Sequence, residues 1–383
     1  MCDILKHTTM KTGDKTMKKT HRTLSLFTVA AMCAALLCSC GAVSDSSQTD
    51  SSSKAAATTT ADTTADTTTT GEASSTASAT SAPDSSVSDS SSAVTDDTKT
   101  NGITPAMWKV TSPEGNTMVM LGSFHALKDE CYPLPEAVTN AYNKADILAV
   151  EYDITSTSED GEYMKNLMKQ MLYNDNTKLS QHISEEAYSA LQTYLGYWGM
   201  DISALEVYRP WAVSSTLDTL LIQDSDFDTE KGLDNFLLTT AHADGKEIYE
   251  VESVDFQMNL LINFSDDIYD LMFRSFEGET KESQKQALDD LYTAWKSGDI
   301  ETFLEEDNDE ELAGYTEEDK KIAEDYNNQM LYDRNKNMAK AAEDLMSQGK
   351  NVFYVVGAAH YAGEGGIIDL LEKDGYTAER VQY

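Results

Sequence analysis

Cysteine is scarce in most of this chain, and that scarcity excludes several kinds of site. Four of the five cysteines, Cys2, Cys33, Cys38 and Cys40, precede residue 41, so Cys131 stands alone in the remaining sequence. Beyond residue 40 the chain therefore cannot form an internal disulfide or a cysteine-based zinc cluster. The sequence around Cys131 does not resemble a cysteine-hydrolase signature, and we expect this side chain to be buried.

Positive charge is also in short supply. The 29 Lys and Arg residues face 66 Asp and Glu residues, which gives a net charge of −37, and no basic patch or stripe is present. Nucleic-acid binding requires such a patch, so we expect no nucleic-acid partner. The Gly-x-Ser-x-Gly, Walker and Gly-x-Gly-x-x-Gly motifs are absent as well. Serine-hydrolase, NTPase and dinucleotide-binding functions therefore have no support.

What the sequence does contain changes abruptly along the chain. Residues 43–100 are almost entirely Ser, Thr, Ala and Asp, and such a segment buries too little apolar surface to offset the entropy lost on folding. We expect a disordered tether at 41–100 and one folded domain at 101–383, a length that supports a single hydrophobic core.

The N-terminal 40 residues have the features of a bacterial lipoprotein signal peptide. A basic segment begins at Met17, which is a possible true start, and is followed by an apolar segment at 24–37. That segment is short for a membrane span and ends in Leu37-Cys38-Ser39-Cys40, which resembles a lipobox. We expect cleavage before Cys40, lipid attachment to Cys40 and an extracytoplasmic, membrane-anchored domain. The alternatives are an ordinary secretory signal or a short uncleaved anchor.

Hydrophobic patterning in the domain predicts a mixed α/β fold. Alternating or continuous apolar stretches predict a hairpin at 107–121, later strands and a strongly apolar strand that ends near His360. Apolar residues at helical spacing predict a large, mostly helical insertion around the sheet. The other predicted strands are 146–152, 246–252 and 378–381, and the predicted helices occupy 133–145, much of 160–245 and 255–345, and 367–373.

Four of the predicted strands end in ionisable residues, namely His125, Glu151, Glu252 and His360. Each histidine closes a Gly-x-x-His sequence that follows an apolar strand. If the strands are parallel neighbours, these side chains meet at one edge of the sheet, where α/β proteins bind ligands. Two histidines and a carboxylate with an open coordination position describe a catalytic divalent-metal site, in which a second carboxylate acts as base or support.

Each of these residues also has a structural interpretation. A histidine or an acid at a strand end is commonly a hydrogen-bonded cap or an ion-pair partner. Asp234 is most simply an N-cap, with a role in the site as the alternative. Arg209-Pro210-Trp211 is most simply the start of a helix with a core tryptophan. Arg334 either clamps a carboxylate or oxyanion, or belongs to a surface ion pair.

An ordered set of short motifs resembles the TraB/GumN family over nearly all of 103–383. The motifs are Leu121-Gly122-Ser123-Phe124-His125, Tyr132-Pro133-Leu134-Pro135, Val150-Glu151, Arg209-Pro210-Trp211, Lys231-Gly232-Leu233-Asp234, Val251-Glu252-Ser253, Arg334-Asn335 and Val356-Gly357-Ala358-Ala359-His360. The family includes Tiki-type metal-dependent proteases and PrgY/TraB proteins linked to the shutdown of peptide pheromones, and its wider relatives include erythromycin-esterase-like and ChaN-like proteins. The resemblance implies that His125, His360 and Glu151 lie in the active site, and it extends to Glu252 and Arg334.

We therefore expect a divalent-metal-dependent hydrolase that cleaves peptides, with Mn, Co or Zn as the ion. His125 and His360 would bind the metal, and Glu151 would be a ligand or a general base. Glu252 would support the site, and Arg334 would bind substrate or stabilise the transition state. Two alternatives stay open: non-catalytic capture of a pheromone, haem or similar ligand, and metal-free esterase chemistry with His125 as base.

Overall fold

The computed structural model describes residues 101–156, 161–304 and 314–383. The predicted signal peptide, the lipidation site at Cys40 and the predicted tether lie outside these residues. In the part of the chain that the structure describes, no helix is both long enough and apolar enough to cross a membrane.

A six-stranded mixed sheet with the order β4-β3-β5-β2-β1-β6 forms the centre of the fold. Strands β2, β5, β3 and β4 are parallel to one another, whereas β1 is antiparallel to both β2 and β6. The central strands β3 and β5 consist of apolar residues that are buried almost throughout, as expected for strands covered on both faces. The strands are β1 (Met107–Thr111), β2 (Thr117–Ser123), β3 (Ile147–Val150), β4 (Glu247–Glu250), β5 (Val352–Gly357) and β6 (Thr377–Arg380).

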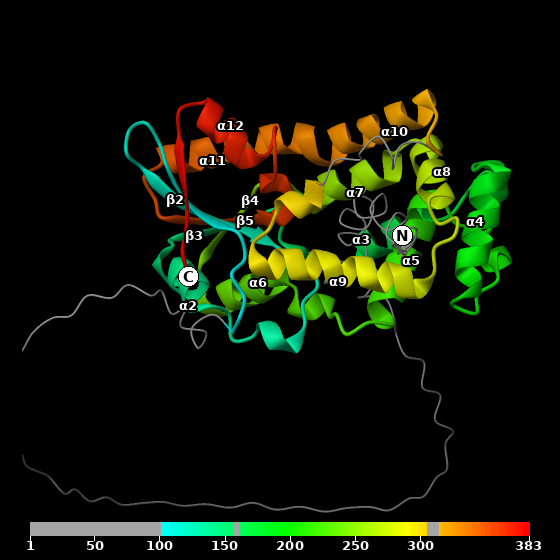
Figure 1. Cartoon of the computed structure of the whole chain (residues 1–383), viewed down its shortest axis with the longest axis horizontal. Helices are drawn as coiled ribbons and strands as arrows, with labels where there is room; N and C mark the ends of the chain where they lie inside the picture. The colour runs from blue at the N-terminus through cyan, green and yellow to red at the C-terminus, as the bar shows by residue number, and fades with distance from the viewer. Residues whose placement is uncertain (1–100, 157–160, 305–313) are drawn as a thin grey trace, which may run out of the picture. The chain divides into compact units, whose positions relative to one another are not determined.

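Helices cover both faces of the sheet. Figure 1 shows α11 and α12 on one side of it and α2 and α6 on the other, while the long helix α9 runs along the molecule. Their apolar side chains join those of the strands in one core cluster. These helices are α2 (Glu136–Lys144), α6 (Leu233–Asp244), α9 (Lys281–Ser297), α11 (Asp333–Ser347) and α12 (Ile367–Lys373).

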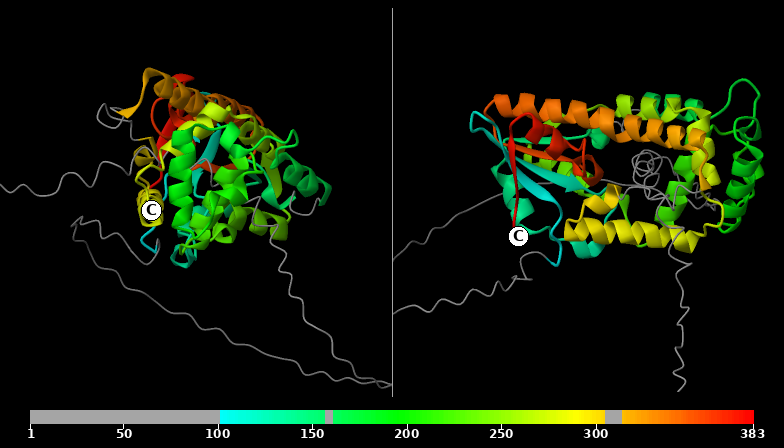
Figure 2. Two further views of the ribbon diagram at one scale, coloured as in Figure 1. Left: turned by 90° about the vertical axis from the view of Figure 1, so that its right-hand side faces the viewer. Right: turned by 45° about the horizontal axis from the view of Figure 1, so that its top comes forward.

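The remaining helices form a helical lobe beside the sheet, at the right in Figure 1 and again in the right-hand view of Figure 2. This lobe has a second apolar core of its own. Side-chain caps start several of its helices: Ser184 accepts from the N–H of Ala187 in α4, and Thr316 forms a capping box with Asp319 in α10. The lobe contains α3 (Gly161–Gln170), α4 (Glu185–Gly196), α5 (Pro210–Gln223), α7 (Val254–Asn263), α8 (Asp266–Arg274) and α10 (Glu317–Asn327).

The predicted mixed α/β fold is confirmed, and so are the hairpin and the helical insertions that follow β3 and β4. Strands β3, β4 and β5 end two or three residues earlier than predicted, and β3 stops at Val150. Strand β4 stops at Glu250, and β5 stops at Gly357, after which the backbone turns into the 3-10 helix η10 (Ala358–Tyr361). As predicted, Pro210 is the first residue of α5 and Trp211 is buried.

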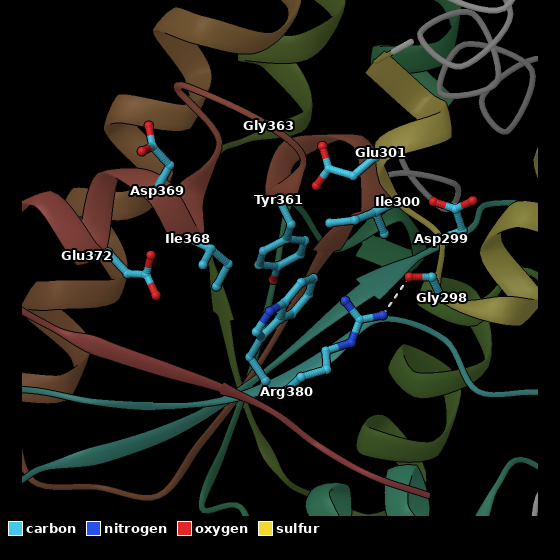
Figure 3. Close-up of a pocket in the computed structure, with 11 residues that line it drawn as sticks. Gly298, Asp299, Ile300, Glu301, Tyr361, Gly363, Ile368, Asp369, Glu372 and Arg380 are labelled. Atoms are coloured by element: carbon cyan, nitrogen blue, oxygen red, sulfur yellow. Dashed lines mark hydrogen bonds between the residues drawn. The ribbon is translucent and has the colours of Figure 1, made fainter.

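One open cavity lies beside β6, the strand at one edge of the sheet. It has a volume of about 380 Å³ and is bounded by β1, β6, α12, η10 and the 3-10 helix η7 (Glu301–Leu304). Figure 3 shows acidic side chains around this cavity, with the aromatic ring of Tyr361 between them.

Candidate functional site

The predicted site residues follow the carboxyl ends of the four parallel strands. His125 comes two residues after β2, Glu151 directly after β3, and Glu252 two residues after β4. His360 lies in η10, three residues after β5. Since these strands are parallel neighbours, all four side chains belong to one edge of the sheet, as the sequence predicted.

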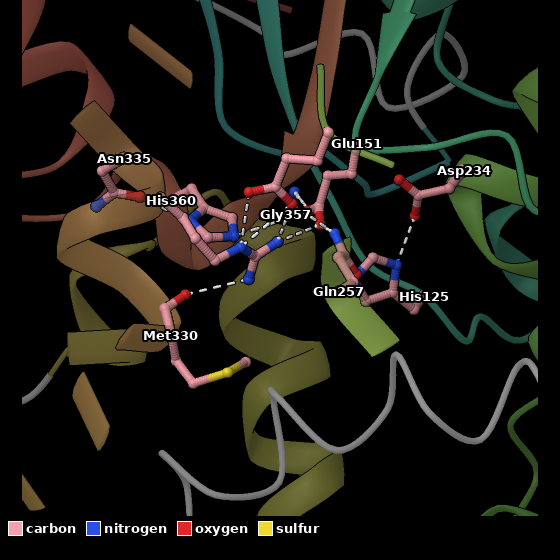
Figure 4. Close-up of polar contacts among 10 residues, drawn as sticks. His125, Glu151, Asp234, Gln257, Met330, Asn335, Gly357 and His360 are labelled. Carbon is pink, nitrogen blue, oxygen red and sulfur yellow. Dashed lines mark hydrogen bonds and ion pairs between the residues drawn. The ribbon is translucent and has the colours of Figure 1, made fainter. Parts of the chain in front are cut away.

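Gly357 marks the point at which these side chains meet. A Cβ atom added to Gly357 would lie 3.1 Å from Glu151 Oε1, 3.6 Å from His360 Cδ2 and 3.7 Å from His125 Nε2. One methyl group would therefore touch all three side chains. The absence of a side chain at Gly357 leaves a small space there that is bordered by two imidazoles and a carboxylate (Figure 4).

His360 is buried and held by an asparagine from α11. Asn335 Oδ1 lies 2.6 Å from His360 Nδ1, and Asn335 Nδ2 donates to the carbonyl oxygen of Gly365 at 3.0 Å. Because the second bond fixes the orientation of the amide, Oδ1 must accept and Nδ1 must carry the proton. This tautomer leaves the lone pair of His360 on Nε2, which lies 3.9 Å from Glu151 Oε1.

His125 is held in the same manner by an acid from α6. Asp234 Oδ2 lies 2.9 Å from His125 Nδ1. A carboxylate accepts from Nδ1–H, so His125 presents Nε2 to the space beside Gly357. The start of α6 approaches closely enough because residue 232 is glycine: a Cβ atom there would collide with the carbonyl oxygen of His125.

The prediction that Asp234 is an N-cap is wrong. Gly232 is the N-cap residue of α6, and Asp234 is the second residue of the helix. Its side chain turns to His125 instead of to the backbone of its own helix. The glycine at the cap position allows the close approach that makes this contact possible.

Glu151 is the centre of a buried polar network (Figure 4). Its Oε1 accepts from the N–H of Gly357 at 2.7 Å, and its Oε2 accepts from Arg334 Nη2 at 2.8 Å and Gln257 Nε2 at 2.7 Å. Arg334, which is 3% exposed, also donates to both oxygens of Glu252 and to the carbonyl oxygen of Met330. Glu252 thus faces Arg334 and Gln257.

Burial and charge set the protonation of this network. Burial alone would raise the pKa of Glu151, but the charge of Arg334, the two histidines and the N–H of Gly357 together hold that pKa well below its ordinary range. Burial, reinforced by Arg334, lowers the pKa of His360 to about 3. At neutral pH the site therefore contains a charged carboxylate beside a neutral imidazole, and a neutral imidazole has the lone pair that a metal ligand needs.

His125, His360 and Glu151 are side chains of the types that bind divalent metals, but they lie farther apart than the ligands of one ion. Among residues 101–156, 161–304 and 314–383, no three His, Cys, Asp or Glu side chains already lie as close as ligands of one ion. Two ligands on one tetrahedral zinc lie about 3.4 Å apart, and the His360–Glu151 separation is 3.9 Å. A small inward movement would close the difference. Two imidazole nitrogens and one carboxylate oxygen suit Zn, Mn or Co.

The structure adds three residues that sequence reasoning did not place in the site: Asp234, Gln257 and Asn335. Each reaches the strand ends from a helix, namely α6, α7 and α11. The sequence held a partial signal for two of them, because Asp234 and Asn335 lie within motifs shared with the family. Gln257 follows Glu252 by five residues, and no motif identified it.

The fold and this arrangement define a class: an α/β protein with two histidines and a buried glutamate at the carboxyl edge of its sheet, each histidine fixed by its own hydrogen-bond partner. The family model for the TraB/PrgY/gumN family matches residues 106–380. The chain belongs to this family.

Curated relatives agree with that assignment at low identity. A protein of Nematostella vectensis named "Metalloprotease TIKI homolog" is 26% identical over 293 residues, which cover 65% of this chain and 61% of that protein. The Escherichia coli protein "Uncharacterized protein YbaP" is 26% identical over 157 residues, covering 41% of this chain and 56% of its own length. "Metalloprotease TIKI2" of Danio rerio is 24% identical over 164 residues, covering 38% and 32%. The chain thus spans about six tenths of the length of the first two relatives. No solved structure matches.

Proposed function

We propose that this protein is a divalent-metal-dependent peptidase. The observation that carries the proposal is the convergence of His125 Nε2, His360 and Glu151 Oε1 on the space left open by Gly357. The names of the Nematostella and Danio relatives, both metalloproteases, support it.

In this proposal His125 and His360 hold the ion through Nε2, and Glu151 completes the ligand set through Oε1. Glu151 suits the part of a ligand better than that of a general base. Both of its oxygens already accept hydrogen bonds, and its depressed pKa makes it a weak base. Oε1 retains a second lone pair for an ion.

Glu252, Gln257 and Arg334 position Glu151 in this scheme. The Nε, Nη1 and Nη2 atoms of Arg334 all donate to protein acceptors, so the guanidinium orients Glu151 and balances two buried carboxylates. When bound, a divalent ion would supply Lewis acidity, which activates water and polarises a peptide carbonyl. Asp234 and Asn335 fix the tautomers that let the two histidines hold it.

We also propose that the domain acts at the outer face of a membrane, anchored through lipid on Cys40. The lipobox-like sequence and the Ser/Thr/Asp-rich segment after it support this location. A tether of this composition would hold the site away from the lipid surface.

The test is cleavage of a peptide library by the purified domain, with and without a chelator, followed by mass spectrometry. We expect cleavage that a chelator abolishes, that added metal restores and that His125→Ala with His360→Ala eliminates. Stoichiometric peptide binding without products, unaffected by chelator, would contradict the proposal and favour the capture alternative. Cleavage that persists in chelator and titrates like a histidine would contradict it in favour of metal-free hydrolysis.

A further inference from the structure

The cavity beside β6 lies next to the candidate site but is separate from it. Tyr361, which lines the cavity, directly follows His360 in η10, and Gly363 lines it two residues later. The short segment that places one histidine at the Gly357 space therefore also forms a wall of the cavity.

Aromatic rings form the inner wall of this cavity. Trp108 and Tyr361 are both buried and stack with their ring centroids 5.0 Å apart. The guanidinium of Arg380 lies over the Trp108 ring at 4.6 Å and donates to the carbonyl oxygen of Gly298 at 2.6 Å. The fold already places one organic cation against the Trp108 ring, which shows that the surroundings tolerate such a group.

Carboxylates surround the aromatic wall. Figure 3 shows Asp369 and Glu372 on one side of Tyr361 and Asp299 and Glu301 on the other. Asp369 is held rigidly, because its Oδ2 accepts from the N–H of Gly365 at 2.7 Å and from Lys373 Nζ at 2.8 Å. The cavity lining carries four carboxylates and a single guanidinium, and Lys373 balances Asp369 from outside the lining. The surroundings of this partly apolar space therefore keep an excess of negative charge.

We propose that this cavity is a subsite for the basic side chain of a peptide, a lysine or an arginine. The inference rests on the proposed peptidase function, since it names the class of peptide that the site takes. The ammonium or guanidinium group would lie among Glu301, Glu372 and Asp369, and its aliphatic stem would pack on Tyr361 and Ile368. The volume of about 380 Å³ accommodates a side chain of this size.

The experiment is a calorimetric titration of the full chain with two acetylated and amidated pentapeptides in the presence of EDTA, which keeps a metal-dependent site silent. One peptide is Ala-Ala-Lys-Ala-Ala, and the other has norleucine in place of lysine, so that only the ammonium group differs. The pocket variant combines Glu301→Gln and Glu372→Gln, two exposed acids. The control variant combines Glu186→Gln and Glu324→Gln, two exposed acids in the helical lobe that remove the same charge.

We expect the lysine peptide to bind the wild-type chain and the control variant about tenfold more tightly than the norleucine peptide, and we expect the pocket variant to lose this preference. Equal binding of the two peptides, or a preference that survives in the pocket variant, would overturn the inference. That failure is distinct from failure of the proposed function, because the binding experiment requires neither metal nor cleavage. Conversely, if the chain prefers the lysine peptide but never cleaves a peptide, the binding subsite is supported and the proposed peptidase function is not.

Discussion

Gly357 gives the candidate site its shape, because a side chain there would fill the space between the two histidines and Glu151. Its backbone, with φ −51° and ψ 138°, is open to alanine, so the demand for glycine comes from space alone. We predict that Gly357→Ala folds normally but binds divalent metal on the order of tenfold or more weakly. Metal affinity measured by competition with a fluorescent chelator tests this.

Gly196→Ala is the matched control for that variant. Gly196 lies in α4, and a Cβ atom added there would have no neighbour within 4 Å. It should leave metal affinity unchanged. If Gly357→Ala binds metal as tightly as the wild type, the space beside Gly357 is not the metal position.

Asn335 and Asp234 contribute through the histidine tautomers that they select. Asn335→Ala removes the acceptor at 2.6 Å from His360 Nδ1, and Asp234→Ala removes the corresponding acceptor of His125. We predict a loss of about 10- to 100-fold in metal affinity for each variant. Asp333→Ala, at an exposed neighbour of Arg334, serves as the control. Unchanged affinity in both test variants would show that these contacts are merely structural.

At this scale the sequence predicted the residues on strand ends and missed most of those on helices. His125 and His360 stood out because a Gly-x-x-His sequence follows two different apolar strands. Gln257 and Asn335 could not be found in the same way, since their place in the site depends on how α7 and α11 pack against the sheet. For Asp234 the sequence favours a cap of its own helix, because the contact with His125 depends on how α6 packs against the sheet.

At the scale of elements, Arg334 connects α11 to the ends of β3 and β4. It follows a turn of π-helix, η9 (Asn328–Tyr332), which contains Met330, one of its acceptors. Such turns recur at functional sites. We predict that Arg334→Ala lowers the free energy of unfolding by about 3–5 kcal/mol, because Glu151 and Glu252 would remain buried without their cation.

Urea denaturation measures that change, and Lys336→Ala is the control. Lys336 is exposed and pairs with Asp333 one turn away, so its removal should cost less than about 0.5 kcal/mol. A loss under about 1 kcal/mol for Arg334→Ala would contradict the account of a tightly coupled network.

Helix α5 carries a buried acid that makes stability depend on pH. Asp218 as a whole is partly buried, but its Oδ2 is fully buried and has no hydrogen-bond partner among the described residues. Burial raises the pKa of Asp218 well above its ordinary value. Between the unfolded pKa of about 3.9 and this raised value, only the folded state keeps the proton, so this group's contribution to stability falls as pH rises.

We predict that Asp218→Asn raises the free energy of unfolding at pH 7 by about 1 kcal/mol or more, because the amide stays neutral. Thermal unfolding at pH 5 and pH 7 should also show a smaller pH effect in this variant than in the wild type. Asp226→Asn, at an exposed position nearby in sequence, should change neither quantity. Equal pH dependence in Asp218→Asn and the wild type would contradict the assignment.

Among the elements, apolar runs predicted the central strands and helical spacing predicted the insertions. The boundaries were less accurate at the site itself. Strand β4 ends before Glu252 and β5 ends before His360, since the chain turns there to direct polar side chains over the sheet edge. Hydrophobic patterning indicates which residues are buried. It does not indicate the residue at which the backbone hydrogen bonds between two strands stop.

At the scale of the whole molecule, the proposed lipid anchor determines where the domain works. We predict that Cys40→Ala abolishes labelling of the chain by radioactive palmitate and moves the domain from the membrane fraction to the medium or soluble fraction. Cys38→Ala, two residues earlier, should leave both unchanged. Labelling that persists in Cys40→Ala would show that the anchor is elsewhere or absent.

Metal content tests the central claim most directly. Inductively coupled plasma mass spectrometry on the purified domain, before and after reconstitution with Zn, Mn or Co, gives the number of ions bound per chain. We expect one ion in the wild type and in Gly196→Ala, and none in the variant that combines His125→Ala and His360→Ala. Equal metal content in the wild type and in the double histidine variant would contradict it.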